Sequence, residues 1–156
     1  IGAQLNKGYN LTQALLNLPA FRRREKALKE VAAEMLEIVG IEDAADKQAD
    51  SLPYGGQRLL EIARTLAMKP RLVLLDEPAA GMNPRESADL IETIRRVQSA
   101  FDLTILLIEH DMKVVMELCQ YIYVMAFGET IFHGVPKEVS EHPKVIEAYL
   151  GRANRA

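Results

Sequence analysis

Two adjacent carboxylates, Asp76 and Glu77, offer the clearest chemistry in this sequence. They follow the apolar run 72–75, and Pro78 comes directly after them. Such a run is typical of a buried strand in a parallel sheet covered on both faces, and open α/β sheets bind ligands at the carboxyl ends of their strands. Because strand side chains alternate, we expect one carboxylate to hold a metal ion while the other faces a reacting water. The alternative is a buried strand followed by an ordinary acidic turn.

A histidine, His110, follows a second apolar run at 103–108. If the two runs form neighbouring strands, its imidazole leaves the same edge of the sheet as Asp76 and Glu77. A single histidine is more often structural than catalytic. We still interpret His110 as a candidate site residue, because it stands at the end of a predicted buried strand.

Two further segments could contact an anionic ligand. The segment 52–57 holds two glycines before a helical pattern, and glycine lets the backbone approach a ligand while a helix N-terminus attracts negative charge. The alternative there is a plain glycine-rich helix entry. The segment 79–83 is a tight loop in which Asn83 is a good N-cap for a helix that begins at Pro84. Its alternative is a simple connection from strand to helix.

The elements that must position these residues follow from periodicity. Residues 1–69 are mostly helical in pattern, with Gly40 as a C-cap, whereas residues 70–156 alternate strands with helices, which indicates parallel α/β connections. No internal repeat or low-complexity segment is visible. We expect helices at 10–18, 22–39, 41–49, 57–68, 84–100, 111–118, 135–140 and 143–150, a loop at 51–56, and strands at 72–75, 103–108, 121–126 and 129–132.

Composition narrows the class of protein. The chain has 156 residues, of which 49% are hydrophobic, and a formal net charge of -3. These values indicate one globular domain with a real core and argue against a dedicated nucleic-acid binder, which is usually basic. The single cysteine, Cys119, excludes an internal disulfide and is interpreted as a small core residue. No apolar run reaches the roughly 18 residues that span a bilayer, so we expect a soluble protein.

One expected motif is missing from the sequence. Phosphate-gripping loops of the form G-x-x-x-x-G-K-[ST] need a Gly-Lys pair, and none occurs here. The chain begins with Ile1, and we expect it to be a piece of a longer protein cut before this residue. In that case the faces and edges of the strands at 72–75 and 103–108 should be exposed, which favours self-association or domain swapping.

Taken together, these segments resemble the ATP-binding cassette ATPases over nearly all of the chain. Residues 55–57 match the second half of the signature motif L-S-G-G-Q, 72–77 match Walker B, 79–83 match the D-loop, and His110 matches the switch histidine. More narrowly, the segments 52–57, 76–84, 108–116 and 134–151 look like the ATPase subunits of branched-chain amino acid importers.

The resemblance implies a role for each matching residue. It implies an α/β fold with part of a P-loop NTPase (RecA-like) core, containing a parallel sheet and preceded by a helical subdomain. Asp76 would hold Mg²⁺, Glu77 would act as general base, and His110 would contact the γ-phosphate of ATP. The segment Tyr54, Gly55, Gly56 and Gln57 would contact ATP bound to a second ATPase subunit, and Asn83 would reach across that dimer.

The family's partners and location are implied as well. Transmembrane permease subunits would contact the helical part, so that the ATPase lies peripherally on the cytoplasmic face of the inner membrane. The family's fold would hydrolyse ATP only when two subunits sandwich the nucleotides. No nucleic-acid partner is expected.

Two departures from the family pattern stand out. Tyr54 occupies the place of the signature serine and Pro53 that of the leucine, so the hydroxyl contact to the partner's nucleotide is either lost or remade by the longer phenol. Asn83 replaces the usual D-loop aspartate. Because positioning supplies most of phosphoryl-transfer catalysis, we expect this piece alone to bind ATP weakly and turn over little.

Two alternatives belong to other classes of protein. One is a non-transport relative that acts in translation or DNA repair, although such proteins tend to carry fused cassettes, long linkers or basic patches, which this sequence does not show. The other is a non-enzymatic interaction piece that retains only the family's scaffold.

Overall fold

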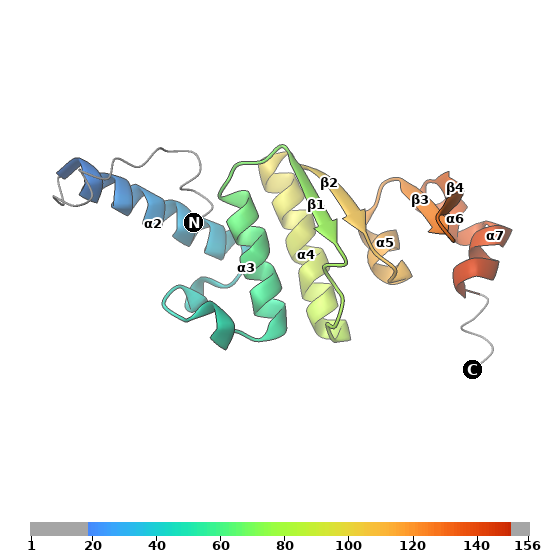
Figure 1. The fold of residues 1–156 in the computed structure, drawn as a ribbon, viewed down its shortest axis with the longest axis horizontal. Coiled ribbons are helices and arrows are strands. Elements are labelled where there is room, and N and C mark those ends of the chain that lie inside the picture. Colours follow the sequence, from blue (N-terminus) through green and yellow to red (C-terminus); the bar gives the residue numbers. More distant parts are fainter. Residues whose placement is uncertain (1–18, 151–156) are drawn as a thin grey trace. The chain divides into compact units, whose positions relative to one another are not determined.

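The computed structural model describes residues 19–150 (Figure 1). Contacts within the chain divide it into two compact units, Ile1–Ile108 and Glu109–Ala156, and each is described by itself. Within the described residues, no helix is long and apolar enough to cross a membrane. The predicted helix at 10–18 lies outside the described residues, and the predicted boundary between 69 and 70 stays a prediction.

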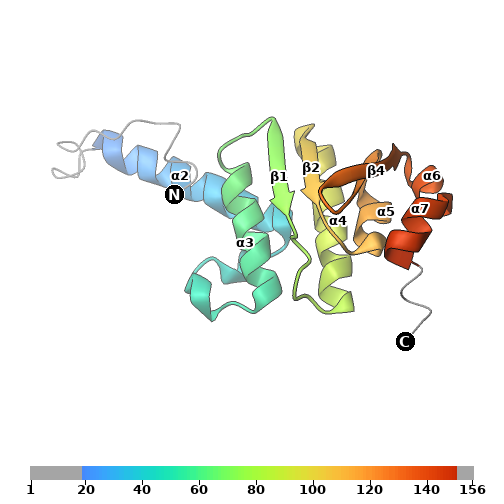
Figure 2. The same cartoon turned by 45° about the vertical axis from the view of Figure 1, so that its right-hand side comes forward.

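The first unit combines helices with a parallel pair of strands. Strands β1 and β2 run side by side in register from Leu72 opposite Thr104 to Asp76 opposite Ile108 (Figure 2). This confirms the predicted parallel connection through one helix. The elements are α2 (Pro19–Val39), the short 3₁₀ turns η2 (Glu42–Ala44) and η3 (Ala49–Ser51), α3 (Tyr54–Leu66), β1 (Leu72–Asp76), α4 (Pro84–Phe101) and β2 (Thr104–Ile108).

The core of the first unit lies between α3, α4 and one face of the sheet. Side chains of α3, α4, β1 and β2 line one small apolar space there, among them Ile62, Val73, Ile94 and Ile105. Helix α2 packs mainly on α3 and buries Val39 at its end. Because folding removes these large apolar side chains from contact with water, their packing supplies most of the stability of the unit.

The opposite face of the β1–β2 sheet is open to solvent. We call it the open sheet face; its apolar members are Leu72, Leu74, Leu106 and Ile108, which are 53%, 67%, 59% and 59% exposed. The expectation that β1 is covered on both faces is therefore wrong, because α3 and α4 supply apolar side chains to one face only. The expected exposure of apolar strand faces is confirmed.

The second unit is a hairpin covered by short helices. Its strands β3 and β4 pair antiparallel, and they turn through Phe127 and Gly128, whose φ angles are 52° and 82°. Its core is formed by Val115, Ile122, Val124, Val139 and Val145. Its elements are α5 (Met112–Leu118), β3 (Ile122–Ala126), β4 (Glu129–Gly134), α6 (Pro136–Glu141), α7 (Pro143–Val145) and the π-helical turn η4 (Ile146–Leu150).

Several element ends differ from prediction. Helix α3 begins at Tyr54 rather than Gln57, so the expected loop at 51–56 is wrong in its second half. Helix α2 begins at Pro19 rather than Arg22, since proline is well tolerated in the first turn. The segment 41–49 forms separate 3₁₀ turns instead of one helical turn. Gly40, with φ 77°, ends α2 as predicted, and the Ile41 amide returns to the Leu36 carbonyl.

Cys119 behaves as the composition suggested. It packs against the core of the second unit, and burial raises the pKa of its thiol. A raised pKa leaves less of the reactive thiolate at neutral pH, which agrees with a packing role.

We predict that the open sheet face drives self-association of this 156-residue chain. Replacing Leu74 with Lys places a charge where 67% of the side chain meets solvent, and it should lower the apparent mass in light scattering. The control is Ser99→Lys, which adds the same charge on an exposed position of α4. A wild-type chain that stays monomeric at high concentration would contradict the prediction.

Candidate functional site

The two carboxylates stand where β1 leaves the sheet. Asp76 is the last residue of β1, and the Glu77 amide still donates to the Ile108 carbonyl at 2.8 Å. Glu77 itself has a φ of 43°, in the left-handed region. Strand alternation therefore ends before Glu77, and the premise for two oppositely directed carboxylates does not hold. Both residues are exposed.

A left-handed glutamate is unusual. The conformation costs a residue with a Cβ roughly 1–2 kcal/mol, and such backbone strain gathers at functional sites. No sequence signal identified it, because glycine is the usual residue for this conformation. Lys69, Asp102 and Phe127 also have positive φ angles, so the strain supports Glu77 only together with its place at the end of β1.

A tight turn joins the carboxylates to α4. The Ala80 amide donates to the Glu77 carbonyl at 3.1 Å, and the Met82 amide donates to the Ala79 carbonyl at 3.1 Å. Gly81 has a φ of 77°, which glycine adopts without steric cost. These bonds set the position of Glu77 relative to the start of α4.

Asn83 caps α4, as predicted. Its side-chain oxygen accepts from the amides of Arg85 and Glu86, both at 3.0 Å, and Glu86 Oε2 accepts from the Asn83 amide at 2.9 Å. This reciprocal pair is a capping box, and Pro84 occupies the first helical position. The structure thus gives Asn83 a local role, and its role across a dimer stays a prediction.

The glycines lie in the first turn of α3, not in a loop before it. Gln57 is the first residue whose amide reaches back, to Pro53 O at 3.0 Å, so the amides of Tyr54, Gly55 and Gly56 belong to the part of a helix that lacks intrahelical acceptors. The Gln57 side chain donates to Leu52 O at 2.9 Å.

The starts of α3 and α4 lie against each other. Gly55 is buried, and a Cβ added there would lie 3.4 Å from Glu86 Oε1. A cavity of about 330 Å³ lies beside them, lined by residues that include Gly55, Gly56, Met82 and Glu86. The structure therefore brings the predicted residues of 54–57 close to the 79–83 loop.

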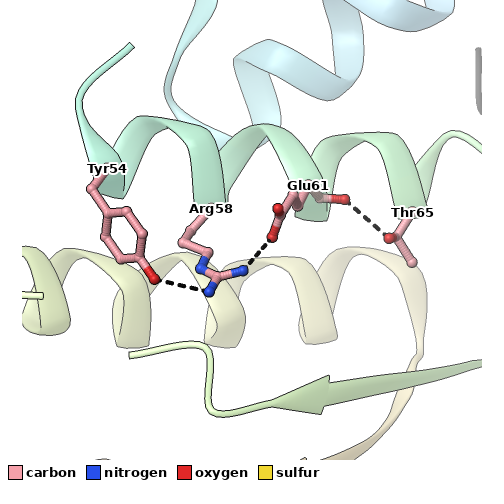
Figure 3. Close-up of polar contacts among 4 residues, drawn as sticks. All are labelled: Tyr54, Arg58, Glu61 and Thr65. Carbon is pink, nitrogen blue, oxygen red and sulfur yellow. Dashed lines mark hydrogen bonds and ion pairs between the residues drawn. The ribbon is translucent and has the colours of Figure 1, made fainter. Parts of the chain in front are cut away.

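Tyr54 is held by a polar network along α3 (Figure 3). Arg58 donates to the Tyr54 hydroxyl at 2.9 Å and to Glu61 Oε2 at 2.8 Å, and its guanidinium lies 5.2 Å from the centroid of the Tyr54 ring. The hydrogen bond to Glu61, then that to Tyr54, raises the pKa of Arg58. Sequence reasoning missed Arg58 and Glu61, although their spacing along one helix face was visible.

His110 belongs to the second unit. Its amide donates to Glu109 Oε2 at 3.0 Å, and its Nδ1 lies 3.9 Å from the same oxygen. The Glu109 side chain is 1% exposed and that of His110 is 68% exposed. Asp111, next in sequence, caps α5 by accepting from the Lys113 amide at 2.8 Å. Because Asp76 and Glu77 lie in the first unit, the predicted approach of His110 to them stays a prediction.

The chain is similar to known proteins over most of its length. A model described as ABC transporter matches residues 4–80, and one described as branched-chain amino acid ATP-binding cassette transporter matches residues 129–154. The chain is 46% identical over 144 residues to the high-affinity branched-chain amino acid transport ATP-binding protein BraF of Pseudomonas aeruginosa, covering 92% of this chain and 56% of BraF. It is 45% identical over 150 residues to LivG of Escherichia coli K12, which bears the same description, covering 96% of this chain and 58% of LivG.

The chain belongs to the ATP-binding cassette transporter family. A crystal structure of the ADP conformation of an ATP-binding cassette from an ABC transporter superposes with a TM-score of 0.75 and 29% identity, over 96% of this chain and 60% of that one. The predicted α/β class, with part of a P-loop NTPase core, is thereby confirmed. The chain spans less than three fifths of the length of BraF and LivG.

We predict that the Asn83 cap contributes measurably to stability in this cassette chain. Asn83→Ala removes the oxygen that two amides share and should lower the free energy of unfolding by about 1 kcal/mol in urea denaturation. Asn83→Asp keeps a capping oxygen and is the matched control. Equal stability of Asn83→Ala and wild type would contradict the capping role.

We predict that the left-handed backbone of Glu77 lowers the stability of the folded chain. Glu77→Gly should raise the free energy of unfolding by about 0.5–1 kcal/mol, because glycine relieves the left-handed strain at some expense in chain entropy. Glu77→Gln keeps the strain and should stay within about 0.5 kcal/mol of wild type. Thermal and urea melts measure both; a destabilised Glu77→Gly variant would show that the conformation is not strained.

Proposed function

We propose that the protein carrying this chain is the ATP-hydrolysing subunit of an importer for branched-chain amino acids. The observation that carries the proposal is Asp76–Glu77 at the carboxyl end of a parallel strand, in a chain that is 46% identical to a branched-chain amino acid transport ATP-binding protein. Hydrolysis of ATP would drive the transport step.

Mg²⁺ and ATP are the cofactors that the family implies. Within residues 19–150, no group of three or more His, Cys, Asp or Glu side chains is arranged to hold a metal ion. A single carboxylate at the end of β1 still fits Mg²⁺, because this ion usually keeps several waters and binds one or two carboxylates together with nucleotide phosphates. Asp76 would be that carboxylate, and when bound the ion neutralises charge on the phosphates.

Glu77 is proposed as the general base. Its exposed carboxylate lies one residue beyond the metal candidate Asp76, so it can accept a proton from the attacking water or polarise it. The left-handed φ of Glu77 and the hydrogen bond from its amide to Ile108 O fix the backbone position from which this side chain extends. His110 is proposed to contact the γ-phosphate and hold Glu77 in line.

The start of α3 is proposed to face ATP bound to a second ATPase subunit. The first-turn amides of Gly55 and Gly56 would contact the γ-phosphate there, since helix N-termini favour anions. Tyr54 and Gln57 flank this contact, and Asn83 lies at the same surface of the dimer. Hydrolysis would then require two subunits.

The permease subunits complete the assembly. We propose that the predicted helical subdomain, 1–69, faces transmembrane permease subunits, so that the ATPase is attached peripherally at the cytoplasmic face of the membrane. A pull-down with the permease subunits would support this arrangement, and its failure with the complete transporter proteins would oppose it.

We predict that Glu77→Gln in the full-length protein leaves nucleotide binding intact, abolishes hydrolysis and traps a dimer. Loss of a general base lowers the rate by about a hundredfold or more, while the neutral amide preserves size. Phosphate release, equilibrium binding of Mg-ATP and gel filtration provide the three measurements. Glu92→Gln, at an exposed position of α4, is the matched control, and near-wild-type turnover in Glu77→Gln would remove Glu77 from the mechanism.

A further inference from the structure

We propose that Tyr54, held by Arg58, is a positioning residue for the turn 77–81 of its own subunit, not a hydroxyl donor to the nucleotide. The inference deepens the proposed function and rests on it, because this turn begins at the candidate base Glu77. It gives Arg58 a role and places a contact within one subunit, between the start of α3 and the turn.

Arg58 fixes the direction of the phenol. Its two terminal nitrogens donate separately, one to Glu61 at 2.8 Å and the other to the Tyr54 hydroxyl at 2.9 Å. A guanidinium has donors only, so the phenol oxygen must accept in this bond. The flat face of the ring also meets the cation, 5.2 Å from its centroid. Together these contacts lay the phenol along the flank of α3, toward Arg58 (Figure 3).

The ring so placed lies on the turn. A Cβ added at Gly81 would be 3.5 Å from Cε1 of Tyr54 and 3.9 Å from its hydroxyl oxygen, so the ring lies over the side of Gly81 where a side chain would project. The neighbouring amide, that of Ala80, donates to the Glu77 carbonyl. A ring that covers Gly81 therefore limits how far the peptide that carries Glu77 can move.

This geometry separates two roles for Tyr54. A residue that replaces the signature serine works through its hydroxyl, and phenylalanine could not substitute for it. A residue that restrains the turn works through its ring, and serine could not substitute for it. The two roles therefore predict opposite rankings of the same two variants.

The experiment compares Tyr54→Phe, Tyr54→Ser and Arg58→Met in the full-length protein, with kcat and KM for ATP measured separately. We expect Tyr54→Phe and Arg58→Met to lose about fivefold in kcat, the value of one hydrogen bond, and Tyr54→Ser to lose roughly tenfold or more. KM should change little in all three. Arg64→Met, which removes an exposed arginine of the same helix, is the control and should behave as wild type.

Hydrogen exchange gives a readout that does not depend on turnover, and a double variant tests whether Arg58 acts through the ring. Hydrogen exchange of the segment 77–83 should be faster in Tyr54→Ser and Arg58→Met than in wild type, at equal melting temperature for Arg58→Met. In the double variant Tyr54→Ser, Arg58→Met, the loss of kcat should equal that of Tyr54→Ser alone, because Arg58 acts through the ring.

Several outcomes would overturn the inference. They are a Tyr54→Ser variant at least as active as Tyr54→Phe, an Arg58→Met variant with wild-type kcat, additive losses in the double variant, or unchanged exchange in 77–83. If the wild-type protein does not hydrolyse ATP, or Glu77→Gln does not matter, the proposed function fails instead. Normal hydrolysis that depends on Glu77, together with any of the overturning outcomes, defeats the Tyr54–Arg58 inference alone.

Discussion

The parallel pairing of β1 with β2 is the constraint on which the candidate site depends. The ladder ends at Asp76 opposite Ile108, and one more backbone bond, from the Glu77 amide, extends beyond it. That bond holds the backbone of Glu77 at the strand end while its φ of 43° turns the chain away from the sheet. The two carboxylates are thus held by different backbone geometries, one extended and one left-handed.

The same turn serves packing and chemistry at once. Asn83 and Glu86 satisfy the first amides of α4, while Glu86 also lies against the buried Gly55 of α3. Helix capping in α4 and the close approach of α3 are therefore linked through one side chain. At the other end of this turn, Gly81 has a φ of 77°, which glycine adopts without steric cost.

Much of this arrangement followed from local patterns. The apolar runs, the Asn83-Pro84 pair and Gly40 each carry a physical requirement that one sequence displays, so the parallel strands, the cap and the end of α2 could be predicted. The start of α3 could not, because proline followed by tyrosine and two glycines is typical of a loop, whereas packing of α3 on α4 stabilises the helical turn. The left-handed Glu77 depends on its pairing with Ile108 across the sheet, which no local pattern displays. The Arg58 network lies within α3, and its i,i+3 and i,i+4 spacings were visible but were not recognised. The place of His110 relative to the carboxylates stays a prediction.

The hairpin tip has a practical consequence for biophysical work. Phe127 is fully exposed, and nothing lies within 4 Å of a Cβ built on the adjacent Gly128. The single native thiol, Cys119, is partly buried, and burial raises its pKa. A maleimide dye would therefore discriminate in favour of a Phe127→Cys thiol, which makes the β3–β4 tip a natural attachment point for fluorophores or spin labels.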